Sequence, residues 1–220
     1  MIPLRSSERV YSRTVVTGSL IALNTIIFLY QFLLGYRVNQ FVQNWGIVPD
    51  DLRLITLVTS MFLHGGWMHL IGNMLFLWVF GRSVEDLIGG TRFLIFYLVC
   101  GVLAGIVQVL ADPYVRVPTI GASGAIAGVM GAYLIRFPRS QIDTLVLLFV
   151  FFTRVAIPAP FYLLFWFAMQ SLSGFESIGE RSYTGGGVAV FAHIGGFIAG
   201  LLLIRLFPSR QRWRHWYEES

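Results

Sequence analysis

Two side chains in this sequence have the chemistry for nucleophilic catalysis: the hydroxyl of Ser123 and the imidazole of His193. A serine hydroxyl becomes a good nucleophile when a base takes its proton. Histidine, with an unperturbed pKa of about 6.5, suits that task at neutral pH. The apolar stretches that hold these two residues contain no Asp or Glu. The pair is therefore either a dyad without a third, acidic member or not a catalytic pair at all.

His69 and Asn73 are candidates for a second part of the same chemistry, the stabilisation of an oxyanion. The two residues are four positions apart, so they share one face of a helix. Together with the backbone N–H of Ser123 they could donate hydrogen bonds to the oxygen that becomes negative in acyl transfer. Each signal is weak alone, because polar residues in apolar helices often only bond neighbouring helices.

Glycines surround Ser123 at positions that coincide with the turns of a helix. They lie at i, i+3, i+7 and i+10, namely Gly121, Gly124, Gly128 and Gly131. On a helix this spacing forms a stripe without side chains, against which another backbone can approach closely. We expect the approaching backbone to be the helix that carries His193.

Composition places the chain among integral membrane proteins. Hydrophobic residues make up 56% of it and charged residues only 12%, against roughly a quarter in soluble domains. All 16 basic residues are arginines, but they lie between apolar runs rather than on one face, which argues against nucleic acid as a partner. The usual metal-ligand spacings and phosphate-binding loops are missing from the sequence, so we expect no metal or other cofactor.

Apolar runs predict six helices that cross a lipid bilayer. The expected spans are 15–34, 66–81, 93–111, 117–135, 155–175 and 182–204. The first has 20 uncharged residues, about 30 Å of helix and hence one hydrocarbon thickness. Residues 144–153 are apolar but too few to cross, and their role is left open. The prediction is an all-α, six-helix membrane bundle.

Arginines predict how this bundle is oriented. With six spans, 12 of the 16 arginines fall on one side, which the positive-inside rule assigns to the cytoplasm. The expected organisation is a cytoplasmic segment 1–14, a membrane domain 15–207 and a basic cytoplasmic tail 208–220. Spans two, four and six then start at the outer face, so the four candidate residues lie at similar depth. The first apolar run is too long for the apolar region of a signal peptide, and no targeting peptide is evident. The absence of a targeting peptide predicts a prokaryotic cytoplasmic membrane.

The combination of motifs resembles the rhomboid intramembrane serine proteases. The segment 121–124, GASG, matches their GxSG motif, and 64–73, HGGWMHLIGN, resembles their HxxxxHxxxN segment. The segment 192–200, AHIGGFIAG, resembles the AHxxG pattern of their last helix. The resemblance implies a six-helix bundle whose Ser-His dyad cleaves transmembrane helices of membrane-protein substrates near the outer surface of the bilayer.

The resemblance also assigns roles to individual residues. Ser123 matches the nucleophile and His193 the base, and His69 and Asn73 match oxyanion donors. Further matches are structural or concern substrate entry: His64 supporting the first loop, Gly196 and Gly200 packing the last helix, Glu85 at the end of span two, and Phe161 and Trp166 at a lateral gate. Apart from the resemblance, the polar and glycine-rich segment 177–187 before the last span could form a mobile cap. Some members stack a tyrosine on the histidine ring, but this chain has Ala127 at that position.

Two other classes of function remain as alternatives. A catalytically inactive rhomboid-like protein would bind transmembrane helices, although such relatives typically lose one member of the reacting pair. A small transporter or channel would place its polar residues near the middle of the bilayer. The sequence specifies neither the substrate nor the oligomeric state.

Overall fold

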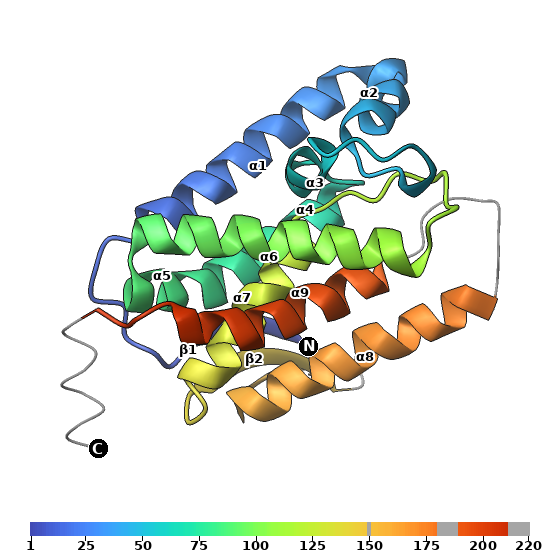
Figure 1. The fold of residues 1–220 in the computed structure, drawn as a ribbon. Coiled ribbons are helices and arrows are strands. Elements are labelled where there is room, and N and C mark those ends of the chain that lie inside the picture. The colour runs from blue at the N-terminus through green and yellow to red at the C-terminus, as the bar shows by residue number, and fades with distance from the viewer. Residues whose placement is uncertain (149–150, 180–188, 211–220) are drawn as a thin grey trace.

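The computed structural model describes residues 1–148, 151–179 and 189–210 of the 220-residue chain. Helices make up most of it, and they surround one short central helix (Figure 1). The α-helices are α1 Val15–Leu33, α2 Val38–Trp45, α3 Thr56–Thr59, α4 Trp67–Phe76, α5 Arg82–Ile88, α6 Gly90–Ala111, α7 Ser123–Arg136, α8 Ala159–Gly179 and α9 Val190–Leu203. A π-helical segment, Leu77–Gly81, joins α4 to α5 without a break in the helix.

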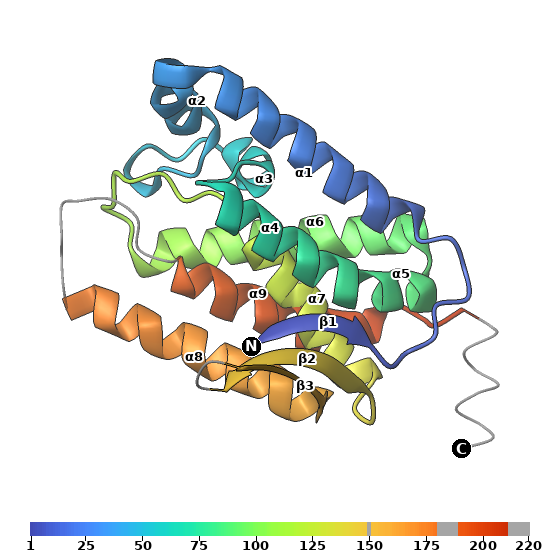
Figure 2. The same ribbon diagram turned by 180° about the vertical axis from the view of Figure 1, so that it is seen from behind.

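The central helix is α7, and its position explains its composition. It has 14 residues, about 21 Å, and ten consecutive residues from Gly124 to Tyr133 are buried. In Figures 1 and 2 it passes through the middle of the molecule, between α4 and α9. Because protein surrounds it, α7 needs neither the length nor the large apolar side chains of a lipid-facing span. Residues 117–122 precede the helix, although the expected fourth span included them.

Helices α7 and α9 approach each other backbone to backbone through glycines. A Cβ atom on Gly196 would collide with the carbonyl oxygen of Gly124, and one on Gly200 with the carbonyl oxygen of Gly128. On its other flank α7 meets α6: a Cβ on Gly124 would lie 2.7 Å from the Cβ of Ala104. The glycine stripe thus lets two helices close on α7 at once, and one of them, α9, carries His193.

The expectation of an all-α protein is wrong, because the structure contains a three-stranded antiparallel sheet. Its strands are β1 Ile2–Ser6, β2 Gln141–Leu148 and β3 Phe151–Pro158, in the order β1-β2-β3 (Figure 2). The described residues of the short apolar segment, 144–148 and 151–153, belong to the paired strands β2 and β3. The fifth long helix starts at Ala159 rather than at 155. Valine, threonine and phenylalanine, which favour strands, are frequent in β2 and β3. An apolar run of this length does not by itself distinguish a strand from a helix.

The start of α1 is held by acidic residues from α5. The Glu85 carboxylate accepts hydrogen bonds from the backbone N–H groups of Val16, at 2.9 Å, and Thr17, at 2.7 Å. Asp86 accepts from the N–H groups of Tyr11 and Ser12, just before the helix. These carboxylates satisfy donors that have no partner within the helix and lie at the positive end of its dipole.

The first loop is fixed to α1 by a buried amide. The Gln31 side chain accepts a hydrogen bond from the N–H of His64 at 3.0 Å and donates one to its carbonyl at 3.2 Å. The His64 ring is 2% exposed and lies edge-on to Phe28 and His69, with centroid distances of 6.5 and 5.1 Å. Burial, and then the neighbouring His69, lower the pKa of His64 to about 3. His64 is therefore a neutral, packed residue at neutral pH.

Within the described residues two helices, α1 and α6, are long and apolar enough to cross a membrane by length and composition. The apolar parts of α8 and α9 are shorter. Six crossings with both ends in the cytoplasm therefore stay a prediction. The expected cap segment 177–187 lies outside the described residues from 180 on, and the tail residues 211–220 lie outside them as well.

The backbone contact between α7 and α9 predicts a strong effect of a single methyl group. We expect Gly200→Ala to separate the helices and to cost about 1–3 kcal/mol of stability, as overpacking does. The matched control is Gly72→Ala in α4, where no atom lies within 4 Å of the added Cβ. Thermal unfolding of the purified protein in detergent measures both variants. Equal melting temperatures for the two variants would contradict the contact.

The low pKa of His64 predicts that acid destabilises the first loop. In the unfolded chain His64 binds a proton near pH 6.5, but in the folded protein only near pH 3, at the cited pKa. Stability is therefore fully present above about pH 6.5 and falls by up to about 1.4 kcal/mol per unit as the pH drops toward 3. Melting temperatures between pH 7 and 4 should fall more steeply for the wild type than for His64→Leu. Parallel curves would show that another group is responsible.

Candidate active site

Ser123 and His193 come together at the point where α7 and α9 begin. Ser123 is the first residue of α7 and His193 the fourth of α9, and the His193 Nε2 lies 2.7 Å from the Ser123 Oγ. The glycine contact between Gly124 and Gly196 lies one residue beyond the serine and three beyond the histidine. A nitrogen at this distance accepts the hydroxyl proton when the neutral ring carries its own proton on Nδ1. The geometry thus fits a general base paired with a nucleophile.

A tryptophan from α8 flanks the His193 ring. The Trp166 ring lies 5.8 Å from it, centroid to centroid, with an angle of 44° between the planes. Trp166 also packs on Phe76 of α4 at 5.9 Å. Because Ala127 has no ring, the aromatic contact with the His193 imidazole comes instead from Trp166, on another helix. Sequence reasoning had placed Trp166 only at a gate.

The start of α9 is held by a glutamine from α6. The Gln108 Oε1 accepts a hydrogen bond from the backbone N–H of Ala192, the residue before His193, at 3.1 Å. This N–H belongs to the first turn of α9 and has no acceptor within the helix. Gln108 thereby helps fix the backbone that carries the imidazole. Sequence reasoning missed Gln108, although a single amide side chain in an apolar run is itself a sign of a structural or functional role.

His69 presents a donor toward the Ser123 loop. Its Nδ1 accepts a hydrogen bond from the Gly65 N–H at 3.3 Å, which leaves the proton of the neutral ring on Nε2. That Nε2 lies beside Gly121, where an added Cβ would be only 2.8 Å away. Gly121 has φ = +125° and donates its N–H to the Ser60 carbonyl at 2.9 Å. Backbone conformation and lack of space therefore both require glycine at 121.

Asn73 brings a second donor near the serine loop. Its side chain is buried, and its Nδ2 lies 3.7 Å from the position of a Cβ on Gly121. Among the residues that the structure describes, this Nδ2 has no hydrogen-bond partner. A buried unpaired amide is costly, so its position beside the serine loop calls for an explanation. An acceptor that arrives with a substrate would supply the missing partner.

The other predicted residues fall into two groups. Gly124, Gly196 and Gly200 form the helix contact described above, and His64 lies behind His69 in the first loop. Phe161, by contrast, is 70% exposed on α8 and has no ring contact among the described residues. The structure therefore places Trp166, but not Phe161, at the contact between α8 and α4. In the described part of the chain, no group of three or more His, Cys, Asp or Glu could hold a metal ion.

Comparison with known proteins identifies the family. Residues 51–210 match the Rhomboid domain. Rhomboid protein 1, mitochondrial, from Saccharomyces cerevisiae is 29% identical over 84% of this chain and 51% of its own length. Presenilin-associated rhomboid-like protein A, mitochondrial, from Danio rerio is 33% identical over 60% of this chain and 35% of its own. Putative rhomboid protease YdcA from Bacillus subtilis is 31% identical over 54% of this chain and 61% of its own.

These relatives correct the expected location. Four of the matched proteins, from yeast, zebrafish and Arabidopsis, carry mitochondrial or chloroplastic names. These names contradict the prediction of a prokaryotic cytoplasmic membrane, which relied on the absence of a targeting peptide, and that prediction is wrong.

The matches define the family more firmly than they define this chain's activity. The chain spans about half of the yeast relative and about a third of the zebrafish one. Rhomboid proteins act on membrane-protein substrates within the bilayer, and most, though not all, are serine proteases. Since the Rhomboid domain match covers residues 51–210, well over half of the sequence, this chain belongs to the rhomboid family of helical membrane proteins.

Proposed function

We propose that this chain is an intramembrane serine endopeptidase that cleaves transmembrane helices of membrane-protein substrates. The observation that carries the proposal is the 2.7 Å separation between His193 Nε2 and Ser123 Oγ. The unused Asn73 amide and the Nε2 proton of His69 beside the same serine loop support it. An organellar inner membrane is the location that we propose, on the names of the relatives.

The proposed reaction proceeds in two halves. His193 Nε2 takes the hydroxyl proton as Ser123 Oγ attacks the peptide carbonyl, and the proton then passes to the leaving amine. Water attacks the resulting ester, His193 takes a proton from it, and that proton returns to Ser123 as the carboxylic acid leaves. No cofactor is needed for this balance of atoms and protons.

The negative oxygen that forms in each half needs donors. His69 Nε2–H, Asn73 Nδ2 and the Ser123 N–H are the candidates, and the N-terminus of α7 adds the positive end of its dipole. Because His193 and Asn73 are buried, the donors act in a dielectric lower than that of water, where each contributes more.

Variants of the dyad test the proposal directly. Full-length protein in detergent is incubated with a panel of reporter transmembrane helices, and cleavage is followed by gel and mass spectrometry. We expect Ser123→Ala and His193→Ala to lower cleavage by at least about 10³-fold, and Asn73→Ala by about 10²-fold. Ser19→Ala, an exposed serine on α1, is the matched control and should retain full activity.

Two outcomes would count against this assignment, provided that all variants are folded. Equal cleavage by wild type and dyad variants would identify a contaminating protease. If no helix in the panel is cleaved but several bind, the alternative of an inactive rhomboid-like protein that binds transmembrane helices would be favoured.

We further expect Trp166 to hold the His193 ring in its productive position. Trp166→Ala should lower kcat about tenfold with little change in KM, because loss of alignment slows the chemical step. Trp166→Phe keeps an aromatic ring at this position and should recover most of the activity. Phe161→Ala, from the exposed face of the same helix, should stay within about twofold of wild type. Faster cleavage by Trp166→Ala would instead identify Trp166 as a gate that restricts entry.

A further inference from the structure

An open apolar groove of about 520 Å³ lies between α1 and α4. It is lined by Ile21 and Thr25 of α1 and by residues of α4 and the following π-helical segment, among them Trp67, Ile71 and Trp78. The Thr25 hydroxyl is bonded to the Ile21 carbonyl within its own helix, so it leaves the groove apolar. Phe76, which contacts α8, lies on a different face of α4. The groove is therefore separate from the candidate active site.

One end of the groove carries an arginine that has no anionic partner among the residues that the structure describes. The Arg82 guanidinium lies over the ring of Trp78, with Cζ 4.3 Å from the ring centroid. In the described part of the chain no acid is within ion-pair distance of it, and its buried Nε has no hydrogen-bond partner. The nearby acids Glu85 and Asp86 accept hydrogen bonds from the residues that begin α1. A partly buried cation of this kind is costly until an anion pairs with it.

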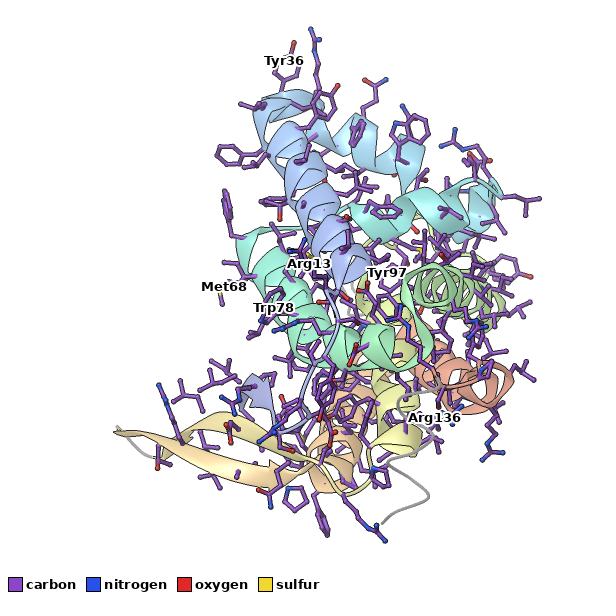
Figure 3. The ribbon with its side chains drawn as sticks, turned by 90° about the vertical axis from the view of Figure 1, so that its left-hand side faces the viewer. Arg13, Tyr36, Met68, Trp78, Tyr97 and Arg136 are labelled. Carbon is purple, nitrogen blue, oxygen red and sulfur yellow. The ribbon has the colours of Figure 1, made fainter. Side chains whose placement is uncertain are left out.

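A second arginine, Arg13, lies in the segment that leads into the nearby start of α1. Arg13 is exposed and lies just before α1. The start of α1 is close to Gly81 and Glu85: the Thr17 hydroxyl lies 3.4 Å from the position of a Cβ on Gly81, and the Thr17 N–H donates to the Glu85 carboxylate. Figure 3 labels Arg13 and Trp78 together with Met68, which lies on the outward side of α4. The groove thus combines an apolar channel with a cationic end.

We propose that this groove binds an anionic glycerophospholipid, with one acyl chain between α1 and α4 and the phosphate paired with Arg82. The guanidinium fork matches two phosphate oxygens and can stack on Trp78 at the same time. From Trp67 to Trp78 the helix rises about 16 Å, about half the hydrocarbon thickness, which suits the chain of a lipid in one leaflet.

Native mass spectrometry of the full-length protein tests the headgroup. The protein is equilibrated with equal amounts of phosphatidylglycerol and phosphatidylcholine that carry identical acyl chains. We expect retention of phosphatidylglycerol over phosphatidylcholine, and Arg82→Gln should reduce this preference about fivefold, the effect of one arginine near an anionic surface. The matched control is Arg37→Gln. The Arg37 Cζ lies 5.5 Å from the centroid of the Tyr36 ring, and Figure 3 labels Tyr36 beyond the other end of α1. Arg37→Gln should therefore not affect the preference.

A bulky residue in the groove tests the acyl chain. Ile71→Trp adds volume at an exposed lining position and should abolish retention of both lipids while the protein stays folded. A photo-crosslinking side chain at position 71 should label lipid. Unchanged preference in Arg82→Gln, an equal loss in Arg37→Gln, or lipid retained by Ile71→Trp would overturn the proposal. So would crosslinking of position 71 to an added transmembrane peptide or to a second copy of the chain.

Discussion

The close contact between the backbones of α7 and α9 is the constraint on which the rest of this structure depends. In a bilayer the hydrophobic effect does not drive helices together, so close packing of small residues has to hold them. Gly196 and Gly200 lie against the carbonyls of Gly124 and Gly128, and no side chain separates the helices there. This contact fixes the relative height and rotation of the helix ends, and thereby the distance from Ser123 to His193. A larger residue would change that distance even though it touched neither of them.

Some buried polar side chains make hydrogen bonds that stabilise the fold, whereas the Asn73 amide has no hydrogen-bond partner among the described residues. The Gln31 side chain forms hydrogen bonds with the backbone of His64, and the Glu85 carboxylate caps the start of α1. Gln108 accepts a hydrogen bond from a backbone N–H in the first turn of α9. Each satisfies backbone groups that would otherwise be unpaired in a medium of low dielectric, where a hydrogen bond is strong and its loss is expensive. The Asn73 amide donor has no such partner among the described residues. We interpret the paired side chains as structural, and the Asn73 amide as part of a site where a bound ligand supplies the missing acceptor.

Helix α4 and its continuation serve two surfaces with different chemistry. One face carries His69 and Asn73 toward the start of α7, and another forms the apolar groove with α1. The π-helical segment Leu77–Gly81 lies at the end of the groove; it contains Trp78 and is followed directly by Arg82. A wider helical turn changes the direction in which later side chains point, and such segments are frequent at functional positions. An occupant of the groove would therefore contact the same helix that bears two candidate oxyanion donors.

The sequence by itself determined the membrane class, most of the helices and the set of residues that meet at the serine. Composition indicates the membrane class. The spacing of small and polar residues indicates the helices and the residues that meet at the serine, because these are local patterns with a fixed period. The sequence did not determine the sheet, since β2 pairs on one side with β3 and on the other with residues 2–6, which are far away in the sequence. Nor did it reveal that Trp166 and Gln108 would meet the helix that carries His193. Those contacts join helices far apart in the chain, and only tertiary packing decides which side chains of each helix face one another.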